Sequence, residues 1–213
     1  MRLCTVRYVA ALWGIAVLVS CTQNFSEEGV NEALRAKELT AVGGQPNQKA
    51  AQAENEGDRT SLGGITVPLP AGWRVATPSS SMRVAEYELP GAGGAATLAV
   101  FHFGPGQGGS VQANIDRWIG QFQQADGSDS RTKARLWNEE VGGMKASMVD
   151  LSGIYSVGPM AGGSGEPLEG YRMVGAIVEA ANGPFFFKLT GPEQTVAQWE
   201  DSFSSYIHGV RPE

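Results

Sequence analysis

The sequence predicts an α+β domain over residues 62–213, in which a largely antiparallel sheet is covered by two amphipathic helices. Three observations lead to this fold class. Short apolar or alternating runs are typical of strands, most connections between them have hairpin length, and two stretches place apolar residues at helical spacing. Hairpins join antiparallel neighbours, and the apolar stripe of each helix needs a sheet to cover, which gives a sandwich of helices and strands.

Three strands are expected before the first helix. Residues 65–70 (ITVPLP) alternate but contain prolines, which favours an edge strand. Residues 81–89 also alternate, and residues 95–103 (AATLAVFHF) are continuously apolar, as in a central strand. Trp73, which follows the first strand, is expected to close one end of the core.

The two helices have recognisable starts. Ser110 is a suitable N-cap for a helix that ends near residues 126–127. The second helix is expected to start near Pro192, with Thr190 and Glu193 forming a capping box. The apolar stripe of each helix is regular. These stripes consist of Val111, Ile115, Trp118, Ile119 and Phe122 in the first helix, and Val196, Trp199, Phe203, Tyr206, Ile207 and Val210 in the second.

Two hairpins are expected between the helices. Residues 133–141 and 145–157 flank a Gly-Gly pair, and residues 171–180 and 184–190 flank an Asn-Gly pair, both of which are hairpin turn signals. A glycine-rich loop, residues 158–170, separates the hairpins.

The N-terminal part has two segments of its own. Residues 1–20 read as a signal peptide, because Arg2 and Arg7 precede an uncharged apolar stretch shorter than the about 20 residues of a membrane-spanning helix. Residues 21–61 are rich in Gln, Asn, Glu, Ala and Gly, a composition that buries too little apolar surface to fold. We expect them to form a disordered tether.

The signal peptide ends in LVSC, residues 18–21, which resembles the lipobox of bacterial lipoproteins. The resemblance implies cleavage before Cys21, a diacylglycerol on its thiol, and anchoring of the protein to a membrane. Thr22 favours the outer membrane if the organism is Gram-negative. An ordinary signal peptide with a chance cysteine, or an uncleaved N-terminal anchor, remains an alternative.

The domain itself resembles the PsbP-like α/β sandwich. The resemblance is carried by residues 67–73 (VPLPAGW), by the middle helix, and by the last helix after a hairpin. The chain also resembles uncharacterised bacterial lipoproteins with a stretch like FxFGPGQGGS before the helix. This family resemblance implies a fold used mainly for binding and assembly, and no functional residue is carried over with it.

Few signals of catalysis or cofactor binding are present. Both cysteines lie in residues 1–21, and His102 and His208 have no metal-ligand spacing, so we predict no metal site and no cofactor. A GxSxG elbow is missing. The net charge of −6 and the absence of a basic cluster argue against nucleic acid.

The glycine-rich loops are the candidate ligand or partner sites. The first lies between a strand and a helix N-terminus, where an anion can bind. It has no Walker lysine, however, and the preferred interpretation is a flexible strand-to-helix turn closed by Ser110. His102 precedes it and can be a ligand, a base or a structural group. The candidate residues are His102, Gly104, Gly106, Gly108, Gly109 and Ser110, with Met160 in the second loop.

Acidic pairs are weaker candidates for acid–base chemistry. Glu86 and Glu88 share one strand face, and with Arg83 nearby they are expected to form a solvated surface. Glu139 and Glu140 form a second pair. Asp150 and Tyr155 lie in an apolar strand and are expected to be buried and paired, with partners left open.

Three functions remain open at this point. The first is a non-catalytic binding or assembly module, tethered to a membrane of the cell envelope and facing an unknown envelope protein in the periplasm or at the cell surface. The second is a carrier of a small apolar or anionic ligand. The third is a hydrolase that uses His102 or the acidic pairs.

Overall fold

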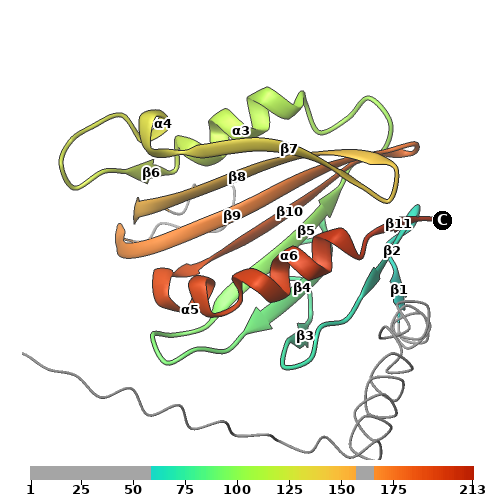
Figure 1. Ribbon diagram of the computed structural model, residues 1–213, viewed down its shortest axis with the longest axis horizontal. Helices are drawn as coiled ribbons and strands as arrows, with labels where there is room; N and C mark the ends of the chain where they lie inside the picture. Colours follow the sequence, from blue (N-terminus) through green and yellow to red (C-terminus); the bar gives the residue numbers. More distant parts are fainter. Residues whose placement is uncertain (1–58, 157–165) are drawn as a thin grey trace, which may run out of the picture. The chain divides into compact units, whose positions relative to one another are not determined.

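The computed structural model describes residues 59–156 and 166–213, which belong to one compact unit, Lys49–Glu213 (Figure 1). The predicted signal peptide, the predicted lipidation site Cys21 and Met160 of the second glycine-rich loop lie outside the described residues. Residues 59–61, which the sequence placed in the tether, form a strand.

The main sheet has eight strands in the order β3-β4-β5-β10-β9-β8-β6, with β7 paired to β8 as well (Figure 1). Each of the pairings between described strands is antiparallel, and β5 is central as predicted. The predicted fold class is therefore confirmed. The strands are β3 (Arg74–Ala76), β4 (Arg83–Leu89), β5 (Ala96–His102), β6 (Phe122–Gln123), β7 (Arg135–Val141), β8 (Met144–Tyr155), β9 (Leu168–Ala180) and β10 (Gly183–Pro192).

A second, three-stranded sheet joins β1 (Arg59–Ser61), β2 (Ile65–Pro68) and β11 (Arg211–Pro212) in the order β1-β2-β11. The prediction of an edge strand at residues 65–70 was wrong, since β2 lies in the middle of this sheet. Its proline is tolerated because Pro68 is the last residue of the strand.

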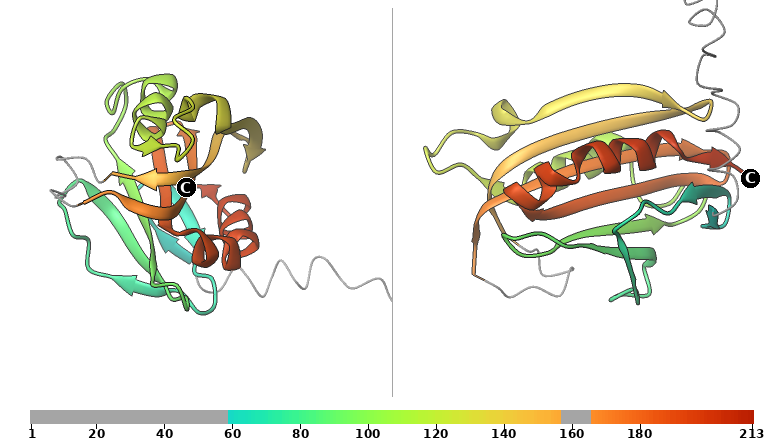
Figure 2. Two further views of the ribbon diagram at one scale, coloured as in Figure 1. Left: turned by 90° about the vertical axis from the view of Figure 1, so that its left-hand side faces the viewer. Right: turned by 60° about the horizontal axis from the view of Figure 1, so that its bottom comes forward.

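Helices cover both faces of the main sheet (Figure 2). Helix α3 (Val111–Ile119) packs on one face, called here the α3 face, and α5 (Glu193–Gln198) and α6 (Glu200–His208) pack on the other, the α6 face. The two faces carry separate apolar cores. The core under α3 includes Ile115, Trp118, Val149, Ile177 and Phe186, and the core under α6 includes Leu98, Phe187, Phe203, Tyr206 and Ile207. Trp73 closes the end of the α6 core, where its ring lies 5.0 Å from that of Tyr206.

The helix ends differ from the predictions. Helix α3 stops at Ile119, and Phe122, predicted as part of its stripe, instead starts β6. A short helix, α4 (Ser130–Lys133), follows and was not predicted. The last helix is broken in two at Trp199, and its predicted capping box does not form because Thr190 remains in β10.

The two predicted hairpins are present. Gly142 and Gly143 connect β7 with β8, and residues 181–182 connect β9 with β10. Strand β9 starts at Leu168, three residues earlier than the pattern indicated.

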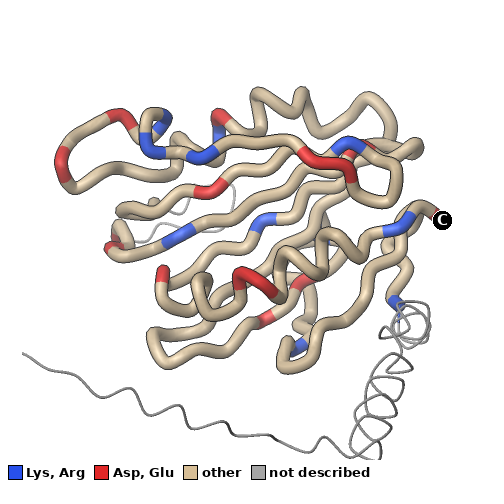
Figure 3. Tube along the Cα trace, in the orientation of Figure 1, with Lys and Arg blue, Asp and Glu red and all other residues tan. Residues whose placement is uncertain are grey.

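Charged residues of both signs are spread over the described domain, with Lys and Arg interspersed among Asp and Glu (Figure 3). Within residues 59–156 and 166–213, none of the helices has the length and apolar character needed to span a membrane.

Candidate functional site

His102 lies on the α6 face at the end of β5. Its ring stacks on Phe185, with centroids 4.1 Å apart, and its Nδ1 lies 3.3 Å from the carbonyl oxygen of Pro184. Glu86 and Ala99, which pair across β4 and β5, lie on the opposite face. The structure therefore does not bring His102 together with that acidic pair.

The first glycine loop is a turn fixed by its backbone. Gly104, Gly106, Gly108 and Gly109 all have positive φ, between 69° and 83°, which L side chains rarely adopt. Ser110 caps α3 as predicted, because its Oγ accepts a hydrogen bond of 3.2 Å from the Ala113 amide. These features account for the glycines and the serine without a ligand.

Glu86 is paired rather than solvated, contrary to the prediction for the Glu86/Glu88 surface. Its carboxylate lies 2.9 Å from Arg83 Nη1 and accepts a bond of 2.7 Å from the Ser79 amide, with only 12% of the side chain exposed. Burial by itself raises the pKa of Glu86, but the Ser79 amide and Arg83 outweigh it and hold that pKa below its usual value. Glu88 is half-exposed and pairs with Arg74 at 2.9 Å.

A β-bulge explains why Arg83 and Glu86 meet. The register of β4 with β5 shifts between Arg83 and Ala85, so Val84 is an extra residue. Strict alternation places residues three apart on opposite faces, but the bulge returns Arg83 to the face of Glu86. Arg83 and Glu86 consequently both lie on the α3 face.

The second acidic pair also has structural contacts. Glu139 accepts a hydrogen bond of 2.8 Å from Trp137 Nε1 and lies 2.7 Å from His208 Nε2. This contact ties the end of α6 to β7. Glu140 lies opposite Lys145 in the β7–β8 hairpin.

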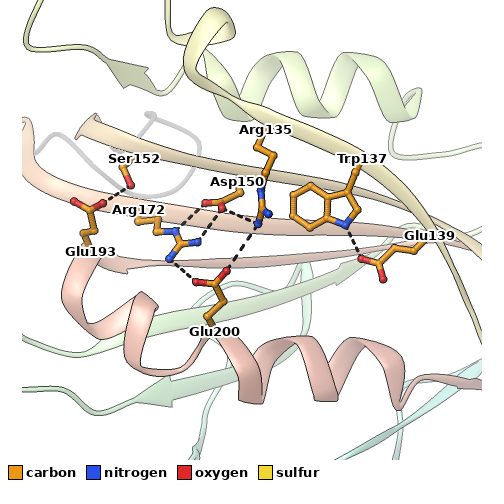
Figure 4. Close-up of polar contacts among 8 residues, drawn as sticks. All are labelled: Arg135, Trp137, Glu139, Asp150, Ser152, Arg172, Glu193 and Glu200. Atoms are coloured by element: carbon orange, nitrogen blue, oxygen red, sulfur yellow. Dashed lines mark hydrogen bonds and ion pairs between the residues drawn. The ribbon is translucent and has the colours of Figure 1, made fainter. Parts of the chain in front are cut away.

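Asp150 is paired, as predicted, but it is only partly buried, with 13% of its side chain exposed, and its main partner is Arg172 (Figure 4). Arg172 donates two bonds of 2.8 Å to the Asp150 carboxylate and one of 2.8 Å to Glu200. Asp150 and Glu200 hold the pKa of Arg172 above its usual value, against the effect of burial. Arg135 adds a contact of 3.2 Å to Asp150, so two cations balance two carboxylates and α6 is fixed to the sheet.

Tyr155, the other buried group of that strand, lies beside a lysine that the sequence analysis did not select. Lys188 is on β10, and its ammonium donates to Tyr155 Oη at 3.2 Å and to Gln121 Oε1. It also lies 5.0 Å from the centroid of the Tyr155 ring, a cation–π contact. We refer to Arg83, Glu86, Gln121, Tyr155 and Lys188 as the Lys188 cluster.

The charge of Lys188 is not balanced by a carboxylate. Its polar partners are both neutral, and no acidic side chain in the described ranges pairs with it. Burial, with a further contribution from the positive charges of Arg83 and Arg117, lowers the pKa of Lys188 from 10.5 to about 7. Burial also raises the pKa of Tyr155, which is therefore a neutral phenol at neutral pH.

The strand register places Glu86 and Lys188 in the same row of residues across the α3 face. Glu86, Ala99, Lys188 and Gly175 form one row across β4, β5, β10 and β9. Trp118 of α3 covers Gly175, where an added Cβ would lie 2.6 Å from its ring. Trp118 also lies against Phe186 of β10, with ring centroids 6.5 Å apart, so α3 packs beside Lys188.

Two buried polar atoms on this face have no protein partner. They are Arg83 Nε and Thr190 Oγ1, where Thr190 is two residues beyond Lys188 on β10. A buried polar atom without a partner costs about 1–3 kcal/mol. Such atoms in a native fold require an explanation.

A separate cavity of about 380 Å³ opens next to α4 and is lined by residues 119–120, 122–124 and 127–130. Its polar side chains are already used by the fold. Gln124 Nε2 donates to Ser130 Oγ and to the Ser152 carbonyl, and Ser130 donates to the Phe122 carbonyl. The cavity is therefore a weaker candidate than the Lys188 cluster.

The sequence contained one signal for Lys188. It is a single charge within FFFKLT, a run that otherwise reads as a buried strand. A lysine in such a run is rarely buried without a partner. The part played by Arg83 had no such signal, because it depends on the bulge.

The described residues contain no group of three or more His, Cys, Asp or Glu side chains arranged to hold a metal. No protein-family model matches the chain, and no curated protein is similar to it in sequence. One solved structure with a similar fold is that of a Pseudomonas aeruginosa protein of unknown function, described as a candidate regulator, with a TM-score of 0.42 and 13% identity over 74% of this chain and 99% of that one. Another is cyanobacterial PsbP from Synechocystis, with a TM-score of 0.44 and 11% identity over 70% of this chain and 87% of that one. Both TM-scores are below 0.5, and neither similarity assigns a family or a function to this chain.

Proposed function

We propose that the protein is a non-catalytic binding module of the cell envelope, held at a membrane by a lipid on Cys21, and that it binds its ligand on the α3 face of the main sheet. The observation that carries the proposal is the unbalanced ammonium of Lys188. A binding site needs a few polar groups with unmet interactions, set among apolar ones. The Lys188 cluster meets this description. Arg172 and Arg135, in contrast, are paired with the carboxylates of Asp150 and Glu200.

The envelope address rests on the LVSC sequence at residues 18–21. Its test is the intact mass of protein extracted from membranes, compared with a Cys21→Ser variant. We expect a chain that starts at Cys21 and carries acyl groups, and we expect the variant to lack them. An unmodified mass in both would refute the lipid anchor.

Binding is tested by native mass spectrometry of the protein purified from its own host. We expect a bound species that is retained by wild type and lost in Lys188→Met. Lys145→Met is the matched control, because Lys145 is an exposed lysine of the same sheet, paired with Glu179 at 3.2 Å. Retention of the species in both variants would place binding elsewhere. Recovery of no species after mild crosslinking would refute the binding function.

The assembly function remains the alternative within the same class. It predicts that the species lost in Lys188→Met is a protein rather than a small molecule. The mass of the species distinguishes the two directly.

A further inference from the structure

We infer that the ligand is a small organic anion, whose head group contacts Lys188 Nζ and Arg83 Nε and whose apolar body lies on the aromatic residues beside them. This inference rests on the proposed function and adds the chemical class of the ligand. Three features of the α3 face support it: its charge, its unpaired donors, and its aromatic borders.

The charge around the cluster is positive. Arg83 contributes a permanent cation and Lys188, with a pKa of about 7, a second one in its protonated form. Glu86 is the one carboxylate that contacts either of them within the described domain. Arg117 on α3 is near enough for its charge to act on Lys188. Glu86 is held by Arg83 and Ser79 and does not pair with Lys188, so an anion at Lys188 would offset the repulsion between the cations.

The unpaired atoms are those an anion needs. Arg83 Nε is a donor that cannot lose its proton, and the Thr190 hydroxyl can donate. Both are buried without a partner. Arg83 lies on β4, and Lys188 and Thr190 lie on β10, on the same face of the sheet with β5 between the two strands. Charged hydrogen bonds from Arg and Lys to a carboxylate or phosphate are stronger than those between neutral groups.

Aromatic side chains flank the cations on both sides. The Arg83 guanidinium lies 5.6 Å from the Phe101 ring centroid, and Phe101 stacks with Phe103 at 6.4 Å. On the other side, Tyr155 stacks with Tyr171 at 5.9 Å. Phe101, Phe103 and Tyr171 are all partly exposed, so an apolar body has surfaces to cover next to the cations.

The inference is tested by calorimetric titration of the full protein in nanodiscs, with empty nanodiscs as the reference. The probes are benzoate, phenyl phosphate, inorganic phosphate, benzyl alcohol and benzylamine. We expect at least one of the two aromatic anions to bind at least tenfold more tightly than the neutral and the cationic probe. Equal binding of benzyl alcohol, or no binding of either aromatic anion, would overturn the anion class. Inorganic phosphate binding as tightly as phenyl phosphate would overturn the role of the apolar body.

Variants then locate the site. Lys188→Met removes the charge but keeps the apolar stem, and we expect it to weaken anion binding at least tenfold. Lys145→Met should bind as wild type does. Unchanged binding in Lys188→Met would overturn the inference. A bound species in native mass spectrometry that is lost in Lys188→Met but is not anionic would leave the proposed function intact and refute only the anion.

Discussion

Replacing Lys188 by methionine is expected to flatten the pH dependence of the domain's stability. In the folded domain, burial and the charges of Arg83 and Arg117 lower the pKa of Lys188 from 10.5 to about 7. Between these two pH values the unfolded chain holds its proton more tightly than the folded one. The free energy of unfolding of the wild type should therefore increase as the pH rises from 7 to 10.

The size of the effect follows from the two pKa values. Each pKa unit corresponds to about 1.4 kcal/mol, so the group contributes an increase of about 3 kcal/mol between pH 7 and pH 10. The free-energy cost of burying the Lys188 charge is fully present below pH 7 and has disappeared above pH 10.5. Measurements should stop at pH 10, because burial raises the pKa values of Tyr87, Tyr155 and Tyr206 and their ionisation in the unfolded chain reverses the trend.

The assay is urea unfolding at several pH values, followed by circular dichroism, for wild type, Lys188→Met and Lys145→Met. The wild type and the Lys145 variant should show the same increase, and the Lys188 variant should lack about 3 kcal/mol of it. At pH 7 the Lys188 variant should be at least as stable as wild type, because it no longer buries a charge. Parallel curves for all three proteins would show that Lys188 is solvated, and the reasoning about the cluster would fail.

Two further changes test the fold around the site. Arg172→Met should lower the free energy of unfolding by about 2 kcal/mol, because it leaves the Asp150 carboxylate largely buried without its main partner and partial solvation reduces the cost. An unchanged urea midpoint would refute this prediction. Gly183→Ala places a Cβ 2.5 Å from the carbonyl carbon of Gly104 and should destabilise the domain by about 2 kcal/mol more than Gly127→Ala, where φ is also positive but nothing lies within 4 Å. Equal losses in the two alanine variants would mean that the loop moves aside freely.

The main sheet could be predicted because its longer strands have alternating or continuous apolar side chains, which are typical of strands. The continuous run at residues 95–103 became the central β5, and the stripe from Val111 to Ile119 became the buried side of α3. The small sheet was missed because β1 and β11 have three and two residues, too few for a periodic signal. The break at Trp199 was missed because its apolar stripe continues across it.

The candidate site was harder to predict than the fold. The sequence drew attention to His102 and the glycine loop, whose residues have structural explanations in the fold. The important pair, Arg83 and Lys188, lies more than a hundred residues apart in the chain, and strand pairing through β5 places both on the same face of the sheet. The bulge at Val84 determines on which face of the sheet Arg83 lies. Faces are predicted from the alternation of side chains along a strand, and a bulge interrupts that alternation.

The three-stranded sheet has a mechanical consequence. The described chain enters the domain at Arg59 and leaves it after β11, and both strands pair with β2 (Figure 1). Arg59 also donates a hydrogen bond of 2.6 Å to the carbonyl oxygen of Gly209, at the end of α6. Tension on the preceding segment would therefore pass through this small sheet and into the C-terminal residues. The eight-stranded sheet, with the Lys188 cluster, lies outside that direct route and could keep its shape while the domain is pulled.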